Sequence, residues 1–285
     1  MTRNFRKISQ VLRSKSTLEG AGVRLKRAFG FNEVPLLDPF LLLDHFGSEN
    51  PADYMAGFPW HPHRGIETVT YMHGGQVDHG DSLGNGGTIN SGDVQWMTAG
   101  SGIIHQEMPR RWEGRMQGFQ LWVNLPAARK MMDPRYRDVR KDQIVAAVPG
   151  PGIQVKVIAG RIAGMEGPVR DIVVPISYFD VSLEPRSRFR HPLPGDWKSF
   201  AYIYSGVGSF APDSKRMIKT GELVLFGEGD EVEVRTDDGE VRFLLVSGQP
   251  LNEPVAWGGP IVMNTRAELE RAFAEYRGGT FIRNR

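Results

Sequence analysis

Two short segments of the sequence carry residues that could hold a metal ion. His61 and His63 stand two residues apart, and His105 and Glu107 repeat that spacing further along the chain. Residues two apart on a β-strand point to the same face. Two such strands facing one another would bring three imidazoles and one carboxylate together, a set that suits a divalent first-row transition metal. The alternative is a metal-free polar network that orients the strands, but burying these groups without partners would cost several kcal/mol.

Glu67 has the same strand parity as His61 and His63, so we expect it on the same face. It could then be a ligand, or it could hydrogen-bond a ligand imidazole or Arg64. We favour the second role, because Glu107 can supply the carboxylate. We expect the other histidines of this half to be surface or core residues, namely His45, His73 and His79.

Aromatic and sulfur-containing side chains flank the two segments. Each is expected to pack in the core, and together they could wall a dry pocket above the metal: Phe58, Trp60, Trp96 and Met97.

The composition limits what the chain can be. Its 285 residues are enough for two domains of ordinary size, and 34 Gly and 19 Pro favour turns and short strands over long helices. The absence of Cys excludes disulfides, thiolate nucleophiles and Cys-based metal sites. A net charge of +2 does not indicate direct nucleic-acid binding. The sequence has no apolar leader and no run of 18 apolar residues, so we expect a cytoplasmic protein without a membrane span.

The first thirty residues are the basic part of the chain. They could form a transit peptide, since they are rich in Arg and Lys and contain Ser. We favour two opening strands joined by a turn at residues 19–22, because Ile8, Val11 and Leu12 precede that turn and Val23 and Leu25 follow it.

Short runs of β-branched and aromatic residues, bounded by turn residues, predict an all-β chain. The expected strands cover 36–46, 66–72, 87–89, 94–98, 118–123, 153–158, 172–183, 199–205, 222–226, 231–235 and 241–246. The polar stretch 127–141 lacks alternation and predicts a connector, which divides the chain into domains 1–135 and 136–285. A short C-terminal helix is expected over 264–276, because Thr265 and Glu268 have capping-box spacing.

The two halves of the chain resemble each other. His61 aligns with His191, and Gly92 aligns with Gly221. The same alignment replaces the remaining ligand candidates, with Leu193 for His63, Val234 for His105 and Thr236 for Glu107. It predicts a domain duplication in which only the first barrel keeps a metal site.

These motifs resemble those of cupins and, more narrowly, of the pirin family. The pattern Gly57, His61, His63, Glu67, Gly74 resembles the first cupin motif. The segments 81–87, 95–109 and 262–265 are similar to pirin sequences, and the resemblance covers essentially the whole chain. It implies two tandem cupin, jelly-roll-like β-barrels with one metal, Fe(II) in most members, held by His61, His63, His105 and Glu107. The ligand types alone would also accept Mn, Ni or Zn.

The resemblance implies two different functions. One is a quercetin 2,3-dioxygenase-like reaction on a flavonol and O2, in which Glu107, with Glu67 in reserve, would act as the catalytic base. The other is a non-enzymatic, iron-dependent redox sensor that binds a transcription factor or a metabolic enzyme. A third possibility is a cupin with a different substrate or metal. We expect a monomer in each case.

Overall fold

The computed structural model describes residues 4–212 and 214–283, which fall into two compact all-β units. The first unit consists of residues 15–141 and 251–283, and the second of residues 4–14 and 142–250.

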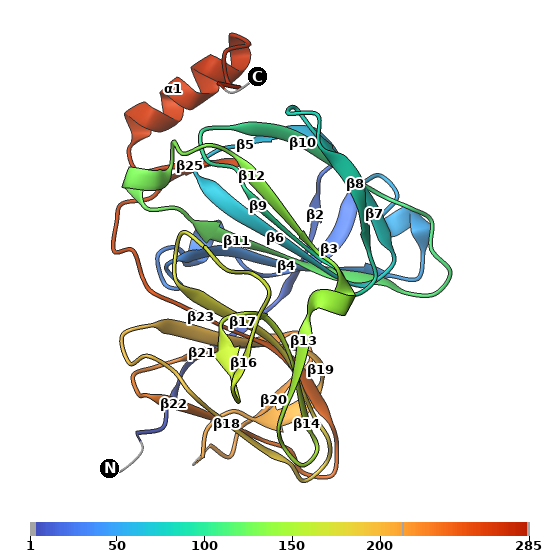
Figure 1. The fold of residues 1–285 in the computed structure, drawn as a ribbon. Helices are drawn as coiled ribbons and strands as arrows, with labels where there is room; N and C mark the ends of the chain where they lie inside the picture. The colour runs from blue at the N-terminus through green and yellow to red at the C-terminus, as the bar shows by residue number, and fades with distance from the viewer. Residues whose placement is uncertain (1–3, 213, 284–285) are drawn as a thin grey trace. The chain divides into compact units, whose positions relative to one another are not determined.

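The first unit contains two antiparallel sheets (Figure 1). The larger sheet has the order β12 (Arg135–Val139), β9 (Val94–Thr98), β6 (Ile66–Gly74), β11 (Met116–Asn124), β4 (Phe40–Ser48), β3 (Val23–Phe29) and β2 (Lys15–Glu19). The smaller sheet has the order β5 (Phe58–His63), β10 (Ile103–Pro109), β7 (Gln76–Asp81) and β8 (Gly86–Asn90).

Alternation along the strands decides which residues face the interior of this unit. On β11, Gln120 and Trp122 line an internal cavity, while Phe119, Leu121 and Val123 are fully buried on the opposite face. One face of this central strand is therefore fully buried, and the other, which is partly accessible, borders the site described below.

The C-terminal segment of the chain adds a hairpin and a helix to the first unit. The hairpin pairs β24 (Ala256–Gly258) with β25 (Ile261–Met263), and Ala272 of helix α1 (Arg266–Arg277) packs beside Ile261 and Met263. Thr265 caps the helix, and its side chain and that of Glu268 form the predicted capping box.

The second unit is built on a ten-stranded sheet. Its main path is β1 (Ile8–Arg13), β21 (Glu222–Phe226), β19 (Lys198–Ser209), β23 (Val241–Gly248), β17 (Ile176–Leu183), β14 (Ile153–Ala159) and β13 (Val145–Gly150). The strands β18 (Arg188–Pro192), β20 (Met217–Lys219) and β22 (Glu231–Arg235) branch from it, and β15 (Arg161–Ile162) pairs with β16 (Met165–Glu166). Apolar side chains fill the interior of this unit, among them Phe179, Phe189, Phe210 and Phe243.

The division of the chain differs from the expected boundary at residue 135 in two places. Strand β1 pairs with β21, so the N-terminal strand belongs to the second unit. The segment after residue 250 returns to the first unit, where Val262 N donates to Arg64 O at 3.0 Å. Both exchanges depend on strand pairing between segments far apart in the sequence, and local composition carries no signal for such pairing.

The polar stretch 127–141 is also different from the expected connector. Residues Arg135–Val139 form an edge strand paired with β9, and Gln95 Nε2 donates to Asp138 Oδ1 at 3.0 Å. The prediction was wrong here because an edge strand can be held by its ladder and polar contacts without apolar alternation. The opening strands are present as β1, β2 and β3, with the turn between β2 and β3. No helix in the described residues is long and apolar enough to span a membrane.

Candidate metal centre

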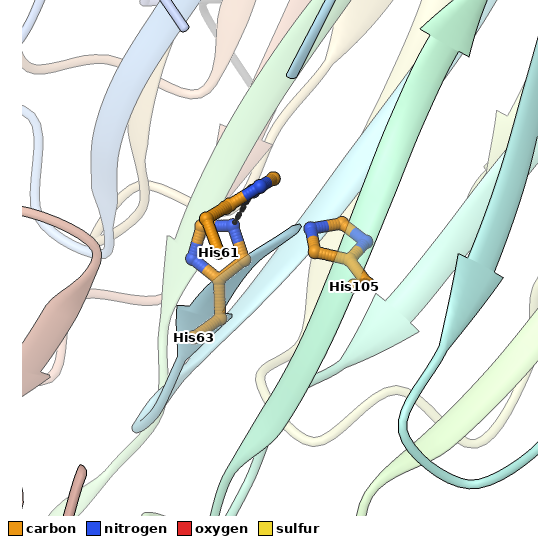
Figure 2. Close-up of side chains that lie close together, drawn as sticks. All are labelled: His61, His63 and His105. Atoms are coloured by element: carbon orange, nitrogen blue, oxygen red, sulfur yellow. Dashed lines mark hydrogen bonds between the residues drawn. The ribbon is translucent and has the colours of Figure 1, made fainter. Parts of the chain in front are cut away.

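Three histidines meet on two paired strands of the first unit. His61 and His63 lie on β5, and the antiparallel pairing of β5 with β10 places His105 directly opposite His61. Figure 2 shows the three rings converging, with His61 Nε2 and His63 Nε2 3.1 Å apart. One ring nitrogen from each histidine lies within 4.8 Å of those of the other two. The structure therefore brings together three of the four residues predicted as ligands.

Backbone carbonyls orient two of these rings. His61 Nδ1 lies 2.8 Å from Pro59 O, and His63 Nδ1 lies 3.1 Å from Pro260 O. A carbonyl only accepts, so each Nδ1 carries the hydrogen and each Nε2 keeps its lone pair. Burial lowers the pKa of His61 and holds those of His63 and His105 well below the usual value, so all three rings are neutral near pH 7.

The third imidazole shows that the group fits a metal ion. Both ring nitrogens of His105 are buried, and neither has a hydrogen-bond partner among the described residues. An unsatisfied buried nitrogen is costly, and a metal ion shared with the other two rings would remove that cost for one of them. Three neutral imidazoles are a ligand set for a divalent transition metal, although they do not select which one.

Glu107 lies near this group without being part of it. Its side chain is buried, lines the cavity, and accepts a hydrogen bond from Thr70 Oγ1 at Oε1, at 3.1 Å. Burial raises the pKa of Glu107 to about 7, since no cationic side chain among the described residues compensates the loss of water. Coordination of the metal by Glu107 stays a prediction.

The structure places Glu67 on the other face of the large sheet. Thr70 lines the cavity, and Glu67, three residues earlier on the regular strand β6, points to the opposite face. There Glu67 Oε1 accepts from Thr98 Oγ1 at 2.6 Å. Glu67 does not share the predicted face, because the chain turns at Gly65, with a positive φ of 78°, between β5 and β6.

Glu67 is not the partner of Arg64 either. Arg64 donates to Glu275 Oε2 at 2.7 Å and to Phe281 O at 2.9 Å, which attaches the segment after His63 to the C-terminal part of the chain. This placement takes Glu67 out of the reserve role in catalysis.

A cavity of about 660 Å³ opens beside His61 and His63. Of the four residues expected to wall it, only Phe58 does so. Trp60 is 53% exposed, Met97 belongs to a separate apolar cluster, and Trp96 lies opposite Val69 on the Glu67 side of the sheet. The aromatic side chains that line the cavity are Phe31, Phe46, Tyr54, Phe58, Trp122 and Trp257.

Sequence reasoning missed the residues that complete this wall. Trp257 and Pro260 come from the hairpin beyond residue 250, and nothing local links them to His63. An ion pair at the cavity was also missed: Arg27 donates from Nε to Asp44 Oδ1 at 2.9 Å and from Nη2 to Oδ2 at 2.7 Å. Burial nonetheless raises the pKa of Asp44 to about 6. The alternation of Arg27 with Val23 and Leu25, all of which line the cavity, is the signal that could have found it.

The second unit has no comparable group among its described residues. Its histidine, His191, lies opposite Val232 on β22, whereas His61 lies opposite His105. If His191 corresponds to His61, then Val232, and not Val234, corresponds to His105. The repeat alignment is therefore wrong by two residues at one of its two matches. His45, His73 and His79 also lie outside the three-histidine group.

Two all-β barrel units, one of which carries a three-histidine group suited to a metal, define a bicupin protein. The family model described as Pirin matches residues 22–123, and that described as Pirin C-terminal cupin domain matches residues 178–282. The chain belongs to the pirin family, as its motifs implied.

Proteins of similar sequence match nearly the whole chain. A pirin-like protein of Caulobacter vibrioides is 43% identical over 277 residues, which cover 97% of this chain and 99% of that protein. Pirin of Homo sapiens is 41% identical over 278 residues, with 95% and 92% covered. The crystal structure of quercetin 2,3-dioxygenase from Acinetobacter baumannii has a TM-score of 0.90 at 32% identity and covers 97% of this chain and 98% of its own.

Proposed function

We propose that this chain is a metal-dependent dioxygenase that opens a ring of quercetin-type flavonols and incorporates dioxygen. The observation that carries the proposal is that two members of the three-histidine group, His61 and His63, line an aromatic-lined cavity. The similarity to the quercetin 2,3-dioxygenase of Acinetobacter baumannii supports the same reaction. We take Fe(II) as the working metal, with Mn, Ni and Zn as alternatives that the three imidazoles would also accept.

His61, His63 and His105 would hold the metal, with Glu107 as the candidate fourth ligand. When bound, a divalent metal of this kind polarises a coordinated oxygen and brings two reactants together.

The chain's own side chains would bind the flavonol and move its proton. Trp122 and Trp257, whose ring centroids are 5.8 Å apart, offer apolar faces to a planar aromatic substrate. Glu107, which lines the cavity, would take the proton of the substrate hydroxyl at a carboxylate oxygen. Thr70 Oγ1, whose single hydrogen is shared between Glu107 Oε1 and Gln120 Oε1, would help to hold that carboxylate in place.

Oxygen uptake with quercetin tests this proposal. We expect uptake with the iron-loaded protein, and loss of both iron binding and uptake in His63→Ala. The matched control is His191→Ala, which removes a buried imidazole from the second unit and should leave both unchanged. Equal uptake in His63→Ala and in the parent protein would refute the enzymatic proposal.

The same experiment separates the enzyme from the redox-sensing alternative. A chain that binds iron through His63 but consumes no oxygen with any flavonol would favour the sensor. Partner capture that differs between the Fe(II) and Fe(III) forms would then support it.

A further inference from the structure

A row of polar side chains crosses the larger sheet along one wall of the cavity. The strand pairing places Thr70 opposite Gln120, Gln120 opposite Asp44, and Asp44 opposite Arg27. All four line the cavity, and Glu107 lies at the Thr70 end of the row. The row therefore starts beside the metal centre and leads away from it across four neighbouring strands.

Apolar side chains border the row on both sides. Trp122 lies opposite Leu42 on one side, and Leu25 lies opposite Phe46 on the other, all of them on the cavity wall. A flat ligand lying against this wall would rest on apolar surface, and only groups along its middle would meet polar partners. In such a largely apolar pocket, the few hydrogen bonds along the row would set the orientation of the ligand.

The row has unused hydrogen-bonding capacity at its centre. Gln120 Oε1 lies 2.6 Å from Thr70 Oγ1, whose single hydrogen is shared between this oxygen and Glu107 Oε1 at 3.1 Å. No described residue accepts a bond from Gln120 Nε2. Each oxygen of Asp44 accepts one bond from Arg27, which leaves each with a second lone pair. Adjacent cross-strand side chains have Cβ atoms about 5 Å apart, so a free amide donor and a free carboxylate acceptor stand side by side.

A phenolic hydroxyl matches this pair, because it can accept from Gln120 Nε2 and donate to an Asp44 oxygen at the same time. Asp44 is two strands from Thr70, or about 10 Å, so a ligand must extend well beyond the metal centre to reach it.

We propose that Gln120 and Asp44 determine substrate specificity by selecting flavonols that carry hydroxyl groups on the ring remote from the metal-binding oxygens. This inference rests on the proposed function, because it assumes that a flavonol enters the cavity with its chelating end at the histidines. It adds that hydroxylation of the remote ring decides which flavonol binds.

Two flavonols that differ only on that ring test the proposal. Quercetin carries two hydroxyls there and galangin carries none. Dissociation constants can be measured for both, in metal-free and in iron-loaded protein, through quenching of tryptophan fluorescence by the ligand. We expect the parent protein to bind quercetin about tenfold more tightly or better, since a hydrogen bond to a charged group commonly supplies that factor.

Gln120→Leu is the informative variant, because it removes the amide and leaves the Arg27–Asp44 ion pair intact. We expect it to bring the two dissociation constants together by weakening quercetin alone. Leu42→Met, on the neighbouring apolar row, is the matched control and should shift both constants equally. Asp44→Asn provides a second variant, whose folding is checked by its circular dichroism.

Two results would overturn the inference while leaving the proposed function standing. One is oxygen uptake by the parent protein with equal affinity for both flavonols. The other is a preference for quercetin that survives unchanged in Gln120→Leu. If the parent protein neither binds nor consumes either flavonol, the proposed function and the inference are both refuted.

Discussion

His191 should make the stability of the second unit depend on pH. Its imidazole packs edge-on against Phe179 and parallel to Phe189, with ring centroids 5.1 Å and 6.3 Å away. Burial lowers its pKa from 6.5 to about 4. Between these values the unfolded chain binds a proton that the folded chain does not, so the free energy of unfolding falls as the pH falls. One pKa unit corresponds to about 1.4 kcal/mol, which gives a loss of about 2 kcal/mol at pH 5 and about 3 kcal/mol at pH 4.

The test compares the parent protein with His191→Leu, which fills the site with an apolar side chain. Hydrogen–deuterium exchange of peptides from β18 and β22 between pH 4 and 7.5 reports the free energy of opening in this unit alone. We expect the difference between the two proteins to shift by about 2 kcal/mol in favour of the variant from pH 7 to pH 5.

Phe189→Leu is the control for packing, because it loosens the same cluster and keeps the imidazole. It should lower the free energy of opening by a similar amount at every pH. Parallel pH profiles for the parent protein and His191→Leu would refute the reasoning, since they would mean that this imidazole titrates alike in the folded and unfolded chains.

Three further substitutions test contacts of the first unit. Gly65→Ala should lower the free energy of unfolding, measured by chemical denaturation, by roughly 3 kcal/mol, because φ is positive there and the new Cβ would collide with Val262 O. Gly84→Ala is the control: φ is also positive, but the space is open, so the same measurement should show a loss of only about 1 kcal/mol. Lys130→Met should cost roughly 3 kcal/mol by the same measurement, since the buried oxygens of Gly65, Asn124 and Val262 lose their donor. Thr265→Ala should cost about 1 kcal/mol and speed amide exchange in the first turn of α1, and unchanged exchange there would contradict the capping assignment.

The part of the site that could be predicted from the sequence is the part set by spacing within one strand. His61 and His63 are separated by one residue, so they point to the same face of one strand. Only one facing strand was then needed to bring His105 to them. The two-residue period of a strand is a local property, so it survives any error in the assumed topology. The capping box at Thr265 and Glu268 was predictable for the same reason.

The face of the sheet could not be predicted for a residue that lies beyond a turn. Glu67 is four residues after His63, but the intervening Gly65 adopts a positive φ and the strand starts afresh at Ile66. One turn residue is enough to exchange the two faces of a strand, as a one-residue slip in register does. The prediction of the pocket walls failed for another reason, because it rested on nearness to the ligands in the sequence, and Trp96 lies opposite Val69 and away from the cavity.

The remaining determinants of the site come from segments that meet only in the folded chain. Pro260 O fixes the tautomer of His63, and Val262 O accepts from Lys130 Nζ, which also donates to Gly65 O. Arg64 is attached to Glu275 by a 2.7 Å ion pair. The segment that carries two of the three histidines is thus held from outside by residues 260–281. Because a metal ligand is useful only when its ring is held in one tautomer and one orientation, the C-terminal segment is as much a part of the metal centre as the strand that bears His63.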